Sequence, residues 1–231
     1  MAASLAAPPA EMGKDRAMAT RTTLDVLDEV LEPAGRAIVD VGCGDGALVR
    51  ALANQGARMT GVEVSAGQLE RARAHPPVAD ERYVEGTAQA LPLDDDAADA
   101  VVFLQSLHHV PPEHMDAALA EAARVAPLIY VQEPLAQGPF FALVALVDDE
   151  TRVRALAQAA IARSPLTVER ELRFDVPVRI RGIDDLREQI VGADPARAAV
   201  FAAREDELRA GLDALGAEIS APSVAHVLRR A

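Results

Sequence analysis

The sequence predicts an α/β fold, a doubly wound and mostly parallel sheet of seven strands with an antiparallel last strand and helices on both faces. Two observations carry this prediction. The apolar run at residues 38–41 ends in a glycine-rich turn, after which apolar residues recur at helical spacing from Ala47. The run at 99–104 is almost continuously apolar, as expected for a strand covered by helices on both faces. Both patterns are typical of alternating strands and helices.

The remaining elements follow in order along the chain. A helix begins at the capping-box-like Thr22-x-x-Asp25 and ends near Gly35, and Ser65-x-x-Gln68 opens another that Pro76 ends. The dipeptide Asp194-Pro195 opens a long helix that ends at Gly216. The predicted strands are 38–41, 58–64, 82–85, 99–104, 127–134, 168–181 and 219–228, and further helices are predicted at 47–56, from 113, and at 148–162.

We expect one domain overall, with three parts. Residues 1–19 are rich in alanine and proline without a period and form a flexible arm. Residues 20–134 form the ligand-binding core, and residues 135–231 complete the sheet and add helices. The added helical stretches, 135–165 and 184–215, are expected to cover the substrate.

Composition excludes several classes of function. The formal charge of −13 makes nucleic acid a poor partner, because binding it requires a basic face. Lysine occurs only as Lys14, which argues against Schiff-base chemistry. The single cysteine, Cys43, permits no internal disulfide and no cysteine-rich zinc site. With no signal peptide and no long apolar run, the sequence predicts a cytoplasmic protein that does not bind membranes.

The turn at residues 42–46 is the expected ligand site. Glycines at alternate positions suit a backbone that takes positive φ or approaches a ligand closely, just before a helix N-terminus. Gly42, Gly44 and Ala47 also match the dinucleotide fingerprint, so the glycines alone leave the ligand open. Asp40 and Asp45 favour a cationic ligand over a pyrophosphate, because their carboxylates repel phosphate and attract an ammonium group.

Residues 39–46, Val-Asp-Val-Gly-Cys-Gly-Asp-Gly, resemble the first motif of class I S-adenosylmethionine-dependent methyltransferases of the small-molecule type. The resemblance covers residues 22–134 and implies a Rossmann-like fold with S-adenosylmethionine as cofactor and S-adenosylhomocysteine as product. Glu63 would bind the ribose, and Thr87 stands where the family usually has the acid that reads adenine. The resemblance assigns these residues to the cofactor: Arg21, Asp40, Gly42, Cys43, Gly44, Glu63, Val64, Thr87, Ala88, Gln89 and Gln105.

His108 and His109 follow the strand at 99–104, and a neutral imidazole suits proton removal near neutral pH. Either is a candidate base, and packing or helix capping is the plain alternative for each. We expect methyl transfer to a small molecule by a monomer or homodimer. Two other readings stay open: an NAD-dependent oxidoreductase and a non-catalytic S-adenosylmethionine-binding protein. The acids at 94–96 are read as a solvated turn, and no metal site is expected.

Overall fold

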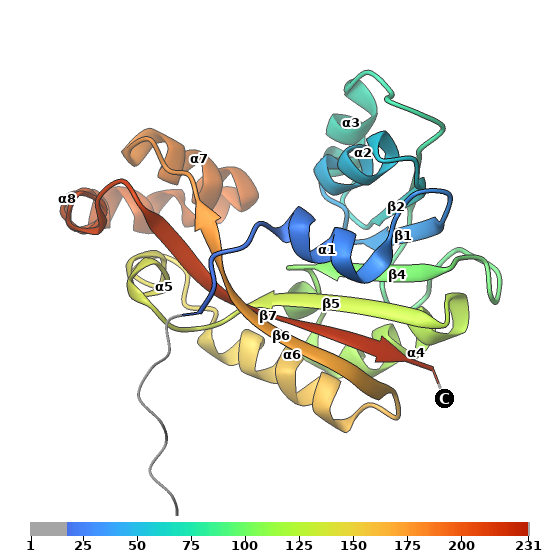
Figure 1. Ribbon diagram of the computed structural model, residues 1–231. Coiled ribbons are helices and arrows are strands. Elements are labelled where there is room, and N and C mark those ends of the chain that lie inside the picture. The colour runs from blue at the N-terminus through green and yellow to red at the C-terminus, as the bar shows by residue number, and fades with distance from the viewer. Residues whose placement is uncertain (1–17, 231) are drawn as a thin grey trace, which may run out of the picture.

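The computed structural model describes residues 18–230, so most of the arm expected at 1–19 lies outside the described residues. A single sheet of seven strands runs through the molecule in the order β3-β2-β1-β4-β5-β7-β6 (Figure 1). Strands β1 to β5 pair in parallel, and β7 lies antiparallel between β5 and β6. The predicted fold class is therefore confirmed, including the antiparallel last strand.

The elements fall close to the ranges expected from the sequence. The strands are β1 Ala37–Val41, β2 Arg58–Glu63, β3 Arg82–Glu85, β4 Ala100–Leu104, β5 Leu128–Pro134, β6 Thr167–Val178 and β7 Ile219–Arg229. The α-helices are α1 Thr23–Leu31, α2 Ala47–Asn54, α3 Ala66–Ala74, α4 Met115–Val125, α5 Pro139–Val144, α6 Thr151–Arg163, α7 Ile183–Ala193 and α8 Ala198–Leu215. Short 3₁₀ turns occupy Leu107–His109, Pro112–His114 and Pro195–Arg197.

Two apolar layers cover the sheet, one on each face. Because side chains alternate along a strand, Ile38 of β1 joins one layer while Val39 joins the other. Helices α1 and α2 pack on the first face, and α4 and α6 pack on the second. Helix α1 lies on a face of the sheet, because its Val26, Leu27 and Leu31 are fully buried among strand residues.

A third apolar cluster, which we call the cap, lies beyond the carboxyl end of the sheet. It combines α5, α7 and α8, which gather at one end of the molecule in Figure 1. Phe201 and Leu208 of α8 and Leu186 of α7 are fully buried there. The hairpin of α7 and α8 leaves the sheet after Val178 and returns at Ile219, and these two residues are register partners. The sequence predicted helical additions here without separating α7 from α8.

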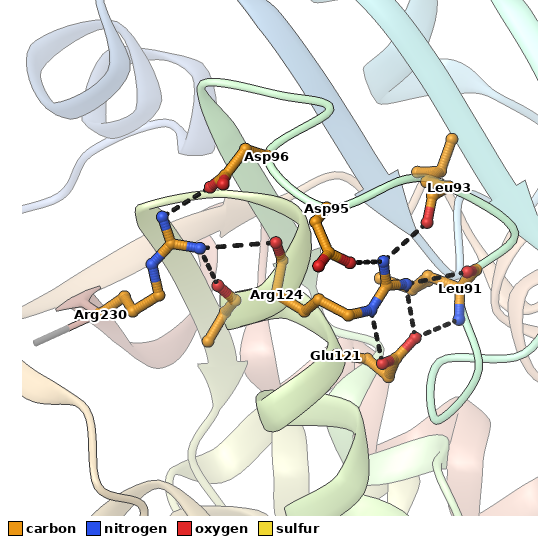
Figure 2. Close-up of polar contacts among 8 residues, drawn as sticks. Leu91, Leu93, Asp95, Asp96, Glu121, Arg124 and Arg230 are labelled. Carbon is orange, nitrogen blue, oxygen red and sulfur yellow. Dashed lines mark hydrogen bonds and ion pairs between the residues drawn. The ribbon is translucent and has the colours of Figure 1, made fainter.

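The loop that leads from β3 towards β4 is anchored to α4 by arginine (Figure 2). Arg124 of α4 donates to the backbone oxygens of Leu91, at 3.2 Å, and Leu93, at 2.8 Å, while Glu121 accepts from the Leu91 N–H. Arg124 also pairs with Asp95, and Arg230 pairs with Asp96. Of the acids at 94–96, which the sequence predicted to form a solvated turn, Asp95 and Asp96 therefore have arginine partners. These pairs hold residues 91–96 against α4 and Arg230.

Candidate active site

The turn after β1 takes the conformation that its glycines allow. Gly42, Gly44 and Gly46 have φ of 74°, 55° and 80°, in the left-handed region that side chains disfavour. A Cβ on Gly42 would stand 2.7 Å from the Cβ of Ser106, which follows β4. Ser106 in turn donates its hydroxyl to the Val41 oxygen at 2.6 Å. The loops after β1 and β4 therefore contact each other closely, because the backbone at Val41 and Gly42 packs against the side chain of Ser106.

A cavity of about 680 Å³ opens above this turn, and we call it the cofactor cavity. A Cβ on Gly44 would meet no atom within 4 Å, so the turn leaves free space there for a ligand. Glu63 lies at the end of β2 and is 8% exposed. Its carboxylate accepts from the backbone N–H groups of Gly44 at 3.0 Å and Ser65 at 2.8 Å, so Glu63 also fixes the turn itself.

Asp40 and Cys43 lie beneath the turn and do not line the cavity. Asp40 is 2% exposed, and no hydrogen-bond donor to its carboxylate is found among residues 18–230. Burial, together with the nearby carboxylate of Glu63, raises the pKa of Asp40 to about 7. Burial likewise raises the pKa of the Cys43 thiol to about 12, which makes it a poor nucleophile.

Most other residues predicted to bind the cofactor do line the cavity. They are Gly42, Val64, Thr87, Ala88, Gln89 and Gln105. Arg21 does not: its guanidinium pairs with Glu29 of α1 at 2.6 Å, and its backbone N–H donates to Asp175 on β6. The structure thus brings the residues after β1, β2, β3 and β4 together and leaves Arg21 apart.

A second cavity, of about 460 Å³, adjoins the first, and we call it the acceptor cavity. Gln105, His109, Ala193 and Arg197 line both, so they mark the junction. Gln105 has a φ of 53°, an uncommon conformation for a residue other than glycine. Its strained backbone stands where the cavities meet. Apolar side chains of the cap and the sheet form much of the remaining wall, among them Phe140, Phe141, Val144, Val178 and Ile190.

His108 is buried at 4% exposure and lines only the acceptor cavity. Its Nδ1 forms a hydrogen bond with the carboxylate of Glu133, the penultimate residue of β5, which is fully buried. The other oxygen of Glu133 accepts from the Leu107 N–H at 3.0 Å. His108 Nε2 lies 3.7 Å from Glu150, a residue that also lines the cavity. The sequence pointed to His108 but not to the carboxylates on either side of it.

His109 faces both cavities, and its ring centre is 4.0 Å from that of His108. The surrounding walls and the neighbouring His108 lower the pKa of His109, because both disfavour its protonated form. His109 is therefore neutral at pH 7. The two candidate bases thus differ: one is held by a buried acid, and the other stands at the junction.

Ion pairs join the polar wall of the acceptor cavity to the cap. Arg154 pairs with Glu150 at 2.7 Å, and Arg197 pairs with Asp148 at 2.7 Å. His108, His109 and Glu150 bring three potential metal-binding atoms within 4.8 Å of one another. However, Arg154 already donates to Glu150, and Glu133 holds His108.

Sequence reasoning missed Glu133, Asp148, Glu150, Arg154 and Arg197. One of these had a visible signal: Glu133 is an acid near the end of an otherwise apolar strand, beside Pro134. Such an acid at the carboxyl end of a strand in an α/β sheet lies where ligands bind. The others sit on segments whose position over the sheet depends on packing of the cap.

No helix in residues 18–230 is both long enough and apolar enough to cross a membrane.

Residues 38–127 match a methyltransferase domain family. A ubiquinone biosynthesis O-methyltransferase of Stutzerimonas stutzeri is 35% identical over 88 residues, which are 37% of this chain and 38% of that protein. The 27-O-demethylrifamycin SV methyltransferase of Amycolatopsis mediterranei is 37% identical over 139 residues, 56% of this chain and 48% of that protein. The chain thus spans less than half the length of these curated relatives.

Solved structures share the fold at low sequence identity. The YcgJ protein of Bacillus subtilis has a TM-score of 0.64 at 20% identity and covers 90% of this chain and 98% of its own. The [4+2]-cyclase SpnF has a TM-score of 0.59 at 21% identity and covers 89% of this chain and 79% of its own. These likenesses establish the architecture, and a cyclase among them shows that architecture alone does not define a reaction.

Proposed function

The chain carries a class I S-adenosylmethionine-dependent methyltransferase domain, and we propose that it methylates a hydroxyl group of a small molecule. The observation that carries this proposal is the pair of adjoining cavities, one above the glycine turn and one under the cap. The names of both relatives above describe methylation at oxygen, which supports a hydroxyl acceptor here.

The residues around the cofactor cavity fit S-adenosylmethionine. Asp40 and Glu63 lie on neighbouring strands, and the pKa of Asp40 is raised first by burial and then by repulsion from the Glu63 carboxylate. A ligand with an ammonium and a sulfonium group would relieve that repulsion, whereas a pyrophosphate would increase it. We assign the methionine part to the turn at Gly42–Gly44 with Gln105, the ribose to Glu63, and the adenine to the segment Thr87–Gln89. Arg21 stays a weaker candidate, since Glu29 holds it.

When bound, S-adenosylmethionine supplies an electrophilic methyl group. The chain contributes alignment: Gln105 and His109 line both cavities, so an acceptor in the second cavity is brought next to the ligand of the first. His108 or His109 takes the proton of the hydroxyl, which is not nucleophilic enough while protonated. Ala193 and Arg197, from the hairpin of α7 and α8, complete the wall of this junction.

We propose that residues 20–134 bind the cofactor, and that residues 135–231 complete the sheet and select the acceptor. A cytoplasmic site of action is proposed from the single cysteine, which is buried and unpaired.

Calorimetric titration with S-adenosylhomocysteine and with NADH tests the cofactor. We expect one site for S-adenosylhomocysteine and no binding of NADH. Tight NADH binding without S-adenosylhomocysteine binding would overturn the proposal in favour of an oxidoreductase. A screen of hydroxylated small molecules with methyl-labelled cofactor tests the reaction, and labelled product eliminates a purely cofactor-binding protein.

A further inference from the structure

Resting on the proposed function, we propose that His108, and not His109, is the general base, and that the buried Glu133 is the residue that positions it. The two histidines adjoin in the chain, but their surroundings differ. Only His108 has a carboxylate on one ring nitrogen and an open cavity beside the other.

The Glu133 carboxylate defines the protonation of the imidazole. An ionised carboxylate only accepts hydrogen bonds, so His108 donates from Nδ1, and Nε2 is left with its lone pair. No hydrogen bond occupies Nε2 among residues 18–230. Leu107 donates to the second oxygen of Glu133 and holds the carboxylate in place. His108 therefore presents a free lone pair to the acceptor cavity.

The charged neighbours of His108 suit a base that becomes positive. Glu133 of β5 and Glu150, just before α6, lie on opposite sides of the ring, so a positive charge that forms there during the reaction would lie between two carboxylates. Arg154 opposes it but is paired with Glu150, and Arg197 is paired with Asp148. His109 also lies near Glu150, but among residues 18–230 it forms no hydrogen bond with a carboxylate, and burial with the neighbouring His108 lowers its pKa and makes it a weak base.

The step balances. As the acceptor oxygen forms its bond to the methyl carbon, the hydroxyl proton moves to His108 Nε2. The bond between that carbon and the sulfonium sulfur breaks, and its electron pair stays on sulfur. One positive charge is lost from sulfur and one appears on the imidazolium, between Glu133 and Glu150. Glu150, 3.7 Å from Nε2, is the nearest carboxylate through which the proton can leave.

Kinetics on a hydroxyl acceptor from the labelled-methyl screen test the assignment. We expect His108→Ala to lower kcat by about 10²–10⁴ and His109→Ala by less than about tenfold. His108→Asn keeps a donor for Glu133 and guards against misfolding, and it should be as inactive. His114→Ala is the matched control, because His114 is exposed and lines neither cavity. A larger loss in His109→Ala than in His108→Ala overturns the proposal.

Glu133→Gln separates positioning from structure. The amide oxygen can still accept from Leu107, whereas its NH₂ group meets His108 Nδ1 with a donor and favours the opposite tautomer. We expect kcat to fall by about 10²-fold with KM changed less than about threefold, and Glu133→Asp to recover part of the loss. Wild-type kcat in Glu133→Gln would sink the positioning role.

A readout without turnover keeps the inference separable from the proposed function. In protein labelled with ¹⁵N-histidine and saturated with S-adenosylhomocysteine, His108 should carry its proton on Nδ1, and Glu133→Gln should move it to Nε2. His109 and His114 signals should stay unchanged. If no acceptor is methylated but this tautomer shift occurs, the proposed reaction fails while the Glu133–His108 pair stands. If His108 carries its proton on Nε2 in wild type, the base assignment fails.

Discussion

The cofactor cavity and the acceptor cavity share Gln105 and His109, yet the chain builds them in opposite ways. Nearly all of the cofactor cavity comes from residues 41–111, where the segments that follow β1, β2, β3 and β4 meet. Only Ala193 and Arg197 reach it from elsewhere. The acceptor cavity instead gathers residues from 105–109, 134–154, 176–179, 189–197 and 221.

On the proposed function, the two cavities separate cofactor binding from acceptor choice within one sheet. We expect changes in the cap to alter the acceptor and leave the glycine turn intact, because Ser106 and Glu63 hold the turn. Each of the following predictions tests how far this separation holds.

The largest effect is expected from Phe201→Ala at the centre of the cap. Removing a fully buried phenylalanine costs about 3–5 kcal/mol, and here the loss should fall on α7 and α8. Hydrogen exchange should show those helices opening, while S-adenosylhomocysteine affinity changes by less than about threefold. Phe103→Ala, in β4 at the main core, is the control that should weaken both regions together. Equal loss of cofactor affinity in the two variants would mean that the regions do not act separately.

A pH effect confined to the cofactor half comes next. Asp40 has a pKa of about 7 when folded, above its unfolded value, so the folded state holds a proton that the unfolded state has released. Stability is therefore present at low pH and is lost as pH rises through 7. Between pH 5 and 8 the ligand-free protein should lose about 2–3 kcal/mol of unfolding free energy from this group, and Asp40→Asn should flatten that loss. Parallel pH curves for the two proteins would assign the loss to other groups.

Cofactor affinity provides a second test of the Asp40 carboxylate. Asp40→Ala should weaken S-adenosylmethionine by about 1.5–3 kcal/mol, the range for a lost charged interaction. Asp45→Asn is the control, since Asp45 accepts from the Ala47 N–H at the start of α2. Because Asp40 lies beneath the turn, a change below about 0.3 kcal/mol would show that its charge does not reach the ligand.

The smallest effect is expected at the end of β2. Glu63→Gln keeps one acceptor oxygen and loses one of the two bonds to Gly44 and Ser65, which costs about 1 kcal/mol. Competition experiments should show weaker binding of adenosine with methionine unaffected. Equal weakening of both competitors would assign Glu63 to the turn alone and remove it from the ribose.

The same contrast explains what could be predicted from the sequence. The parallel half of the sheet could be predicted, because each of its expected binding positions depends on a short stretch of sequence. A strand is followed by a glycine or an acid and then by a helix, as at Gly42 and Glu63. The cap could not, because pairs such as Arg197 with Asp148 join segments whose approach depends on packing. Glu133 is visible in the sequence as an acid near the carboxyl end of an apolar strand, but the sequence does not show that His108 lies beside it. Its role appears only once His108 is beside it.

The register of β6 with β7 has a consequence for how such a chain can change. The residues that flank the hairpin of α7 and α8, Val178 and Ile219, are register partners in the sheet. The helices between them therefore leave and rejoin the sheet at one place. On the proposed function, a different segment joined at this pair would change the wall of the acceptor cavity. It would also replace Ala193 and Arg197, the two hairpin residues that line the cofactor cavity.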